Sequence, residues 1–430
     1  MCLIEKQGGK LVFLLSVPRS GSSLLTAILQ NHSRLFATQE MWFLLSLYDL
    51  PQSHARPYGG TGILRQFFKG MVPPHVLEQA ARSYALEIYN GLLQGTTADM
   101  LIDKSPRYYT VLEFVDRLFP AARRVWLIRN PLSIVASFKK VNQLRNGNFH
   151  LLKELGSPHF NMKMTDITVG LFRYAHYFAT PHPLAYPLMY EQLVANPRME
   201  IEKLCHFLEI HYEPGMERYG NFADTPQSNL FYSMGAGDPF VMEHEQAHQN
   251  SVHSWQHLLS TMEVELYCRS IGARLFRQLG YGEALEQAEQ MTGVRFEDDP
   301  DVELLSRRTH QFLQQSGFEW KTAYRMLEEQ DADNKGFMTN ATCHAAPHNP
   351  ARMDMAQIVS DRRIQSLENR LAHSFEERNR LIAQLQSYQR PSQGFRSHLL
   401  ARKFGRWASE VLSSIGKEKG GERECNCRNL

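Results

Sequence analysis

The residues from 16 to 24 have types and spacing suited to binding a phosphate or a similar anion. They read Ser-Val-Pro-Arg-Ser-Gly-Ser-Ser-Leu and come at the end of an apolar run that starts at Leu11. Where a buried strand leads into a helix, successive backbone N–H groups point into one concavity, and the helix dipole favours an anion there. Gly21 would let the backbone approach a phosphate closely. The side chains that would add donors or positive charge to this phosphate loop (16–24) are Arg19, Ser20, Ser22 and Ser23.

The phosphate loop differs from the Walker A sequence GxxxxGK[ST] of ATP- and GTP-binding proteins. Ser16 stands where the first Gly of that pattern would be, and Ser22 stands where the Lys would be. Without that Lys, a standard ATP or GTP site is disfavoured. Two other interpretations of the loop stay open: a P-loop kinase or other nucleotide transferase, and a plain strand–helix turn capped by a Ser.

A second set of candidate phosphate ligands follows an apolar run at 124–129. Arg129 is followed by Asn130 and Pro131, and Ser137 comes eight residues after the Arg. A guanidinium offers forked donors to a phosphate, and a hydroxyl can complete the site. Ligands of open α/β sheets bind at the carboxyl ends of strands, which is where the pattern places Arg129.

Short apolar runs alternate with amphipathic stretches through residues 1–282. Strands are expected at 11–17, 100–103, 124–129 and 186–190, and helices from near Ser22 and over 109–119, 132–141 and 198–208. Such alternation predicts an α/β domain with a parallel central sheet covered by helices on both faces. The region 43–98 shows no clear pattern and is rich in aromatic and turn residues, so acceptor specificity is expected there.

The alternation fades after residue 282. A helical extension (283–330), a linker (331–360), a short coiled coil (361–390) and a basic amphipathic helix with a disordered tail (391–430) are expected next. The coiled coil depends on a heptad pattern over 364–385, in which two of seven seam positions are polar, and it would allow a homodimer. The basic helix could make peripheral contact with an anionic membrane, although packing on a neighbouring helix is the commoner role.

Taken in order along the chain, these segments resemble the motifs of the sulfotransferases that use 3′-phosphoadenosine 5′-phosphosulfate (PAPS). The family's PRSG[ST][ST] loop for the 5′-phosphosulfate resembles residues 18–23, and its RNPxxxxxS motif for the 3′-phosphate resembles residues 129–137. Other similar segments are Asp103-Lys104-Ser105-Pro106, the stretch 190–197 that begins with Tyr190, and a late loop with Gly237-Asp238-Pro239 and Ser254-Trp255. In that late loop, family members often carry Lys or Arg before the Trp, and this chain does not.

The resemblance covers about residues 10–280 and implies roles for individual residues. It implies a P-loop type fold, PAPS as co-substrate without a metal, and Tyr190 and Ser254 near the nucleotide. A Glu placed like Glu40 is the general base in the tyrosylprotein and heparan branches, and Arg19, in place of the Lys of a KSGTTW loop, favours this branch. Lys104 and Arg19 would then place positive charge near the leaving phosphate oxygen.

Several of these residues also have simpler interpretations. Glu40 could instead steady the helix expected from Met41 onward, and His32 could be the base, because cytosolic members of the family use a His. Lys104 could be a solvated charge at a strand end, and Tyr190 could belong to the core. Trp255 is expected to be a packing anchor.

Composition limits the partners and the compartment. The formal net charge of +2 gives no indication of a nucleic-acid partner. No metal site is expected, because the sulfuryl transfer that the resemblance implies needs no metal. Six scattered Cys residues fit a reducing compartment, and no apolar run approaches the ~18 residues of a membrane span.

We therefore expect a cytoplasmic sulfotransferase. Its acceptor would be a hydroxyl on a carbohydrate, a lipid-linked sugar, a peptide or a small molecule, among which the sequence does not choose. A non-catalytic scaffold that senses nucleotide and assembles through the coiled coil remains an alternative.

Overall fold

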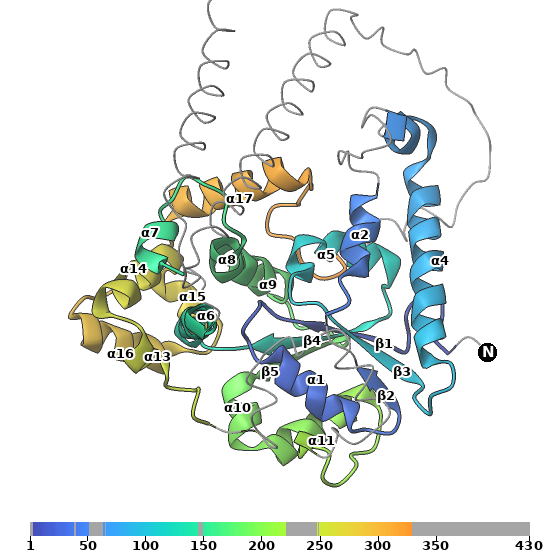
Figure 1. Ribbon diagram of the computed structural model, residues 1–430, viewed down its shortest axis with the longest axis horizontal. Helices are drawn as coiled ribbons and strands as arrows, with labels where there is room; N and C mark the ends of the chain where they lie inside the picture. Colours follow the sequence, from blue (N-terminus) through green and yellow to red (C-terminus); the bar gives the residue numbers. More distant parts are fainter. Residues whose placement is uncertain are drawn as a thin grey trace, which may run out of the picture. The chain divides into compact units, whose positions relative to one another are not determined.

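A five-stranded parallel sheet lies at the centre of the described structure (Figure 1). This computed structural model describes residues 3–328, apart from 38–39, 51–62, 65, 145–148, 221–246 and 248. All four strand pairs are parallel, and the order in the sheet is β2-β3-β1-β4-β5. The strands are β1 (Leu11–Leu15), β2 (Leu35–Ala37), β3 (Met100–Lys104), β4 (Arg123–Ile128) and β5 (Ala185–Met189). The predicted parallel α/β fold is confirmed.

Alternate residues of the central strand β1 belong to two hydrophobic clusters on opposite faces of the sheet. Val12 and Leu14 pack with α1 (Ser22–Gln30), α10 (Tyr190–Ala195) and α11 (Pro197–Leu208). Leu11, Phe13 and Leu15 pack with the other cluster. Its helices include α4 (Pro74–Leu93), α5 (Leu112–Leu118), α6 (Pro131–Leu144) and α9 (Leu171–Tyr177). In Figure 1, α1, α10 and α11 lie below the sheet and α5 and α9 above it. Burial on both faces explains why the strand sequences are almost wholly apolar.

The structure shifts several of the predicted boundaries. The strand expected at 11–17 ends at Leu15, because the phosphate loop begins with Ser16 and Val17. The helix expected over 109–119 begins as a 3-10 turn, η2 (Tyr108–Thr110), and continues as α5. Strand β2 was not predicted, since three residues are too few to give a pattern.

The described part of the region 43–98 contains helices that the sequence did not indicate: α2 (Phe43–Asp49), the π-helical turn η1 (Gln66–Met71) and the twenty-residue α4. Helix α4 buries a stripe of Ala81, Ala85, Tyr89 and Leu93. The helix also exposes the apolar residues Val76, Tyr84 and Ile88. Exposed apolar residues outside the buried stripe blur the helical period, which is why the sequence did not indicate this helix.

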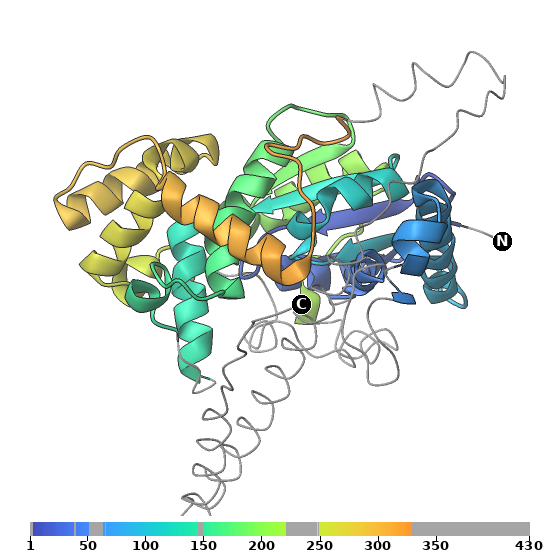
Figure 2. The same ribbon diagram turned by 90° about the horizontal axis from the view of Figure 1, so that it is seen from above.

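Further helices, some between β4 and β5 and the others after β5, join the hydrophobic cluster that contains Leu11, Phe13 and Leu15. They are α7 (Leu151–Glu154), α8 (Met162–Thr165), the π-helical turn η3 (Asp166–Gly170), α13 (Trp255–Leu258), α14 (Thr261–Ile271), α15 (Ala273–Gln278), α16 (Gly282–Thr292) and α17 (Val302–Ser316). Leu285 of α16, Phe312 of α17 and Tyr324 belong to the hydrophobic cluster that contains β1. Helix α17, orange in Figure 2, lies against α8 and η3. The described part of 283–330 therefore packs on the sheet domain.

The predicted linker, coiled coil and basic helix (331–430) lie outside the described residues. Within the part of the chain that is described, no helix combines the length and the apolar character needed to cross a membrane.

Candidate active site

The carboxyl ends of the five strands lie along one edge of the sheet, and each is marked by predicted site residues. Glu40 comes three residues after β2, Lys104 is the last residue of β3, and the phosphate loop follows β1. Arg129 directly follows β4, and Tyr190 directly follows β5. The sheet order therefore gives the order of the site in space: Glu40, Lys104, the phosphate loop, Arg129 and Tyr190.

The strand register shows how closely these positions approach the phosphate loop. Leu14 of β1 pairs with Lys104 of β3, and Leu15 pairs with Trp126 of β4. Neighbouring strands are about 4.8 Å apart, so Lys104 and Arg129 flank the phosphate loop from its two sides.

The backbone of the phosphate loop takes left-handed conformations at two positions. Gly21 has a φ of 95°, which costs a glycine little. Arg19 has a φ of 74°, which is unusual for a residue with a side chain. A Cβ atom on Gly21 would lie 2.4 Å from the ring of Tyr190, so only glycine allows this ring to cover the loop. The glycine at this position is therefore required by the packing of Tyr190.

Arg19, Arg129 and Ser137 come together although they lie far apart in the sequence. The Nε of Arg19 donates to the Ser137 hydroxyl at 3.1 Å. The Nη1 of Arg129 donates to the Arg19 carbonyl at 2.9 Å, which helps to hold the left-handed turn. The Arg129 guanidinium also lies over the Tyr190 ring, 4.3 Å from its centre, in a cation–π contact. Tyr190 is therefore part of the site as well as of the core.

The described end of the late loop closes against Arg129 and Tyr190. Ser251 accepts a bond from Arg129 Nη2 at 3.2 Å through its carbonyl, and its hydroxyl is 2.8 Å from the Tyr190 hydroxyl. Ser254 donates to the same Ser251 carbonyl at 3.0 Å, so its hydroxyl holds the loop together. Trp255 is 1% exposed and packs in the core, as predicted. Gly237, Asp238 and Pro239 lie outside the described residues.

Three buried polar atoms at this end of the sheet have no hydrogen-bond partner among the described residues. They are the hydroxyl oxygens of Ser16 and Ser20 and the Nε of Arg129. Buried donors are nearly always paired, because an unpaired one costs about 1–3 kcal/mol. The first turn of α1 also carries no acidic residue, and Gly21, its N-cap, makes no side-chain cap. Donors without partners at a helix N-terminus fit an anionic ligand.

On the other side of the phosphate loop, Glu40 and Lys104 form an ion pair. The Lys104 Nζ lies 3.5 Å from Glu40 Oε1. The Lys104 side chain is fully buried, whereas the Glu40 side chain is 32% exposed. The interpretation of Lys104 as a solvated charge is therefore wrong. Helix α2 begins at Phe43, with Trp42 rather than Glu40 at its N-cap.

The neighbour of Lys104, Asp103, is fixed by a buried network. Its carboxylate accepts bonds from the hydroxyls of Tyr89 at 2.6 Å, Tyr108 at 2.9 Å and Ser105 at 2.9 Å. Burial raises the pKa of Asp103 even though these donors and Lys104 act in the opposite direction. The network anchors the end of β3, and with it the position of Lys104.

His32, the alternative base, has a structural environment. Its Nδ1 accepts from the Arg34 N–H at 3.0 Å, so Nε2 is the donor to the His211 carbonyl at 2.7 Å. The residue is 3% exposed. Both ring nitrogens are thus engaged by the backbone of the protein.

Sequence analysis missed four residues that contact the predicted ones. Trp42 and Arg107 lie beside Glu40, and Ser251 lies beside Arg129 and Tyr190. Glu191 accepts from the Asn130 N–H at 3.1 Å and from the Tyr281 hydroxyl at 2.5 Å. The sequence could have indicated two of these residues, because Trp42 comes two residues after Glu40 and Glu191 directly follows Tyr190. Among the described residues, no group of three or more His, Cys, Asp or Glu is placed to hold a metal ion.

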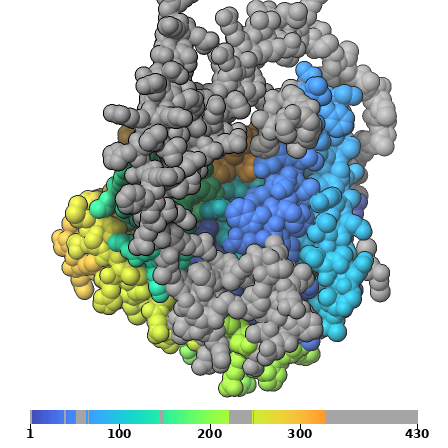
Figure 3. All heavy atoms as spheres, in the orientation of Figure 1, coloured from blue at the N-terminus to red at the C-terminus, as the bar shows by residue number. Residues whose placement is uncertain are grey.

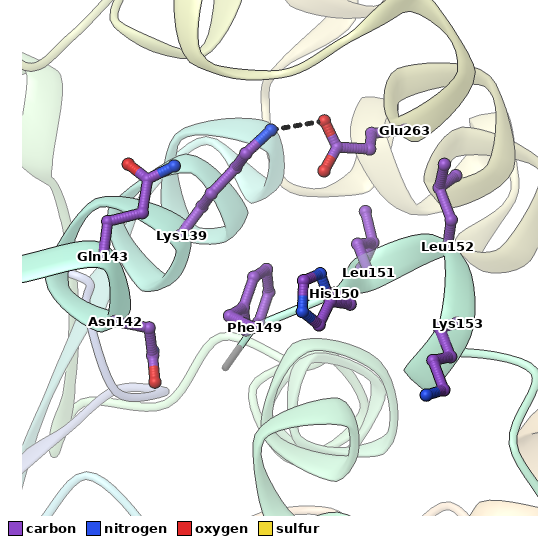
Figure 4. A pocket seen from close by; sticks show the side chains of 9 residues that line it. All are labelled: Lys139, Asn142, Gln143, Phe149, His150, Leu151, Leu152, Lys153 and Glu263. Carbon is purple, nitrogen blue, oxygen red and sulfur yellow. Dashed lines mark hydrogen bonds and ion pairs between the residues drawn. The ribbon is translucent and has the colours of Figure 1, made fainter. Parts of the chain in front are cut away.

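The space-filling view shows the sides of the molecule that border this region. Residues of α2 and α4 (blue) lie on one side and those of α13 to α16 (yellow) on the other (Figure 3). A separate pocket of about 490 Å³ lies along α6, lined by Lys139, Asn142, Gln143, Phe149, His150, Leu151, Leu152, Lys153 and Glu263 (Figure 4). None of the predicted site residues lines it.

Comparison with known proteins finds similarity to sulfotransferases. The model of the sulfotransferase family matches residues 12–214, a range that holds every predicted site residue except Ser254. Nodulation protein NoeE of Sinorhizobium fredii (strain NBRC 101917 / NGR234) is 28% identical over 288 residues, covering 64% of this chain and 67% of that protein. Protein-tyrosine sulfotransferase 1 of Danio rerio is 25% identical over 201 residues, covering 46% of this chain and 53% of that protein.

Among solved structures, the sulfotransferase domain from the curacin biosynthetic pathway has a TM-score of 0.42 and 21% identity, covering 63% of this chain and 97% of that one. The sulfotransferase domain from the Synechococcus PCC 7002 olefin synthase has a TM-score of 0.40 and 22% identity, covering 60% and 92%.

The protein is an enzyme, a transferase that moves a sulfuryl group. The sulfotransferase family is the one that residues 12–214 of this chain match. This similarity implies PAPS as the donor and a hydroxyl-bearing acceptor. The unpartnered hydroxyls of Ser16 and Ser20 and the Arg129 Nε fit the phosphate groups of such a nucleotide.

Proposed function

We propose that this enzyme transfers a sulfuryl group from PAPS to an acceptor hydroxyl, with Glu40 as the general base. The observation that carries the proposal is the row of side chains along the carboxyl edge of the sheet. It places a buried Lys104 and an accessible Glu40 on one side of the phosphate loop. Arg129, which has an unpartnered buried donor atom among the described residues, lies on the other side.

The two ends of the nucleotide would be held by different elements. Arg19, Ser20, Gly21, Ser22 and Ser23 would bind the 5′-phosphosulfate, with the N–H groups at the start of α1. Arg129 and Ser137 would bind the 3′-phosphate and so select this nucleotide over ATP. Tyr190 and the late loop with Ser254 would enclose the nucleotide between them.

The reaction would be a direct in-line transfer. The acceptor oxygen forms a new bond to sulfur while the bond from sulfur to the 5′-phosphate oxygen breaks, and 3′-phosphoadenosine 5′-phosphate (PAP) leaves. Glu40 takes the proton of the acceptor hydroxyl. Lys104 and Arg19 stabilise the negative charge that develops on the leaving phosphate oxygen.

For the acceptor, we propose a carbohydrate or lipid-linked hydroxyl that enters beside Glu40. The relatives that match include a nodulation protein and protein-tyrosine sulfotransferases, so a peptide hydroxyl is the alternative to screen. We also propose a cytoplasmic enzyme that dimerises through 364–385. We further propose that the basic helix at 395–412 makes peripheral contact with a membrane.

The other functions have less support. A kinase would use the Lys of a Walker A loop, and this position is Ser22. A scaffold that only senses nucleotide would have no need for an ion pair of Glu40 and a fully buried Lys104 beside the phosphate loop.

Calorimetric binding of PAP to the wild type and to Arg129→Ala, with ATP as the control ligand, tests the nucleotide assignment. We expect the wild type to bind PAP and ignore ATP, and Arg129→Ala to lose about 10- to 100-fold in affinity, as for a charged hydrogen bond. Preference for ATP, or no binding of PAP, would contradict the proposal. Glu40→Gln should then bind PAP normally while turnover falls about 10²- to 10⁴-fold.

A further inference from the structure

Trp42 contacts the proposed base directly. Its indole Nε1 donates a hydrogen bond of 2.7 Å to Glu40 Oε2. The other carboxylate oxygen, Oε1, lies 3.5 Å from the Lys104 Nζ. The Glu40 carboxylate is therefore held from both sides, by an indole that follows it in the sequence and by an ammonium group at the end of β3.

The backbone of Trp42 is in an uncommon conformation. Its φ is 60°, in the left-handed region, where a bulky residue costs about 1–2 kcal/mol. Such a conformation persists only where surrounding contacts fix it. The Trp42 N–H approaches the Ser105 hydroxyl at 3.4 Å, and Ser105 in turn donates to Asp103. The turn between Glu40 and α2 is thus tied to the network that anchors β3.

The indole ring of Trp42 is itself held by a second ion pair. The Arg107 guanidinium lies 5.2 Å from the centre of the ring. Arg107 is bound to Asp166 through Nε at 3.0 Å and through Nη2 at 2.8 Å. Asp166 is fully buried in η3 and also accepts from the Tyr109 hydroxyl at 2.9 Å. A rigid chain of contacts therefore runs from the buried Asp166 through Arg107 and Trp42 to Glu40.

We infer that Trp42 is a positioning residue that aims the Glu40 carboxylate at the acceptor, and that Arg107 and Asp166 hold Trp42 in place. This inference rests on the proposed role of Glu40. A glutamate has three rotatable side-chain bonds, and at 32% exposure its own packing does not fix its direction. Misplacing a catalytic group by ~1 Å can cost about 10²-fold in rate. Fixing one oxygen by the indole and the other by Lys104 leaves the carboxylate a single orientation.

Trp42→Phe tests this inference because it keeps an aromatic ring for Arg107 and removes only the N–H donor. We expect kcat to fall about 10- to 100-fold, while the KM for PAPS and the calorimetric affinity for PAP stay within about twofold of wild type. Trp320→Phe is the matched control. Trp320 also donates through Nε1, to the Thr110 carbonyl at 2.7 Å, and also carries an arginine, Arg173, over its ring at 4.5 Å.

A merely structural role would show the same fall in melting temperature for Trp42→Phe and Trp320→Phe, with kcat unchanged in both, and would overturn the inference. If Trp42→Phe does not fold, Arg107→Lys provides the second test, because Lys keeps the charge beside Asp166 and loses the planar group over the indole. We expect the same selective loss of kcat, smaller in size. Wild-type kcat in a folded Arg107→Lys would also overturn the inference.

Glu40→Gln separates this inference from the proposed function. If Glu40→Gln keeps wild-type turnover, then Glu40 is not the base and the proposed function fails. If Glu40→Gln is inactive but Trp42→Phe has wild-type kcat, the base assignment stands and only the positioning role fails.

Discussion

Two regions of the molecule differ in whether their polar groups have partners within the protein. At the carboxyl edge of the sheet, the Ser16 and Ser20 hydroxyls and the Arg129 Nε are buried without partners among the described residues. In the pocket along α6, several polar groups are paired within the protein, among them Lys139 with Glu263 (Figure 4). There Lys139 bonds Glu263 at 2.7 Å, Glu263 accepts from the Ser260 N–H at 2.8 Å, and Asn142 accepts from Lys163 at 2.6 Å.

Pocket volume alone would have favoured the pocket along α6. The pocket along α6, at about 490 Å³, falls within the ~300–1,000 Å³ typical of ligand sites. Lys139 and Glu263 already neutralise one another there, so a ligand that bound either group would have to break this ion pair. The phosphate loop has donors that the protein itself does not satisfy, and an anion would satisfy them. Buried donors without a partner therefore indicate a ligand site better than the volume of a pocket does.

Gly21→Ala should give the largest effect on the nucleotide side of this comparison. The new Cβ would lie 2.4 Å from the Tyr190 ring, and alanine disfavours the φ of 95°. We expect kcat/KM for PAPS to fall by about 10²-fold, with PAP affinity falling in parallel, measured by initial rates and calorimetry. Gly91→Ala is the control, because a Cβ there meets nothing within 4 Å. Unchanged PAP affinity in Gly21→Ala would show that the nucleotide does not contact the phosphate loop.

Ser20→Ala should lower binding and raise stability at the same time. Removing an unpartnered buried hydroxyl relieves the free protein of a cost of about 1 kcal/mol, while the nucleotide loses a donor and roughly 5- to 10-fold in affinity. Chemical denaturation without nucleotide and PAP calorimetry measure the two changes. Ser133→Ala is the contrast, since the equally buried Ser133 hydroxyl bonds the Val252 carbonyl at 2.9 Å and its loss should destabilise the protein. If Ser20→Ala loses stability as Ser133→Ala does, the Ser20 hydroxyl is not an unpartnered group in the free protein, and the contrast with the pocket along α6 fails.

Glu263→Gln should give the smallest effect, confined to stability. Burial opposes ionisation of Glu263, but bonds from Lys139 and Ser260 outweigh it and lower its pKa. A carboxyl whose pKa is lower in the folded state stabilises the protein above its unfolded pKa, and the stabilisation is lost as pH falls through the folded value. We expect a loss of about 1 kcal/mol at pH 7 that shrinks below about pH 4.5.

Thermal unfolding of wild type and Glu263→Gln across pH measures this effect. Glu265→Gln, which breaks an exposed pair with Arg269 on the same helix, is the control and should change little. PAP affinity should stay at the wild-type value in both variants. A fall in PAP affinity or turnover in Glu263→Gln would mean that the pocket along α6 does take part in function.

The parts of the site that sequence analysis found are those that local chemistry specifies. The phosphate loop was visible because a strand, a glycine turn and the start of a helix are consecutive in the chain. Arg129 and Ser137 were visible because they share a single strand–helix unit. Helix α4 was missed because the exposed apolar residues Val76, Tyr84 and Ile88, outside its buried stripe, blur the pattern. Strand β2 was missed because three residues carry no period.

By itself, the sequence determined the parallel α/β fold and an anion site at the ends of its strands, because both follow from patterns within a few consecutive residues. Only the tertiary structure decided what those strand ends meet. The order β2-β3-β1 brings Glu40 beside Lys104, which lies 64 residues further along the chain. The turn η3 brings Asp166 to Arg107, and Arg107 to Trp42. Such contacts depend on which elements pack together, and patterns within a few consecutive residues do not specify this packing.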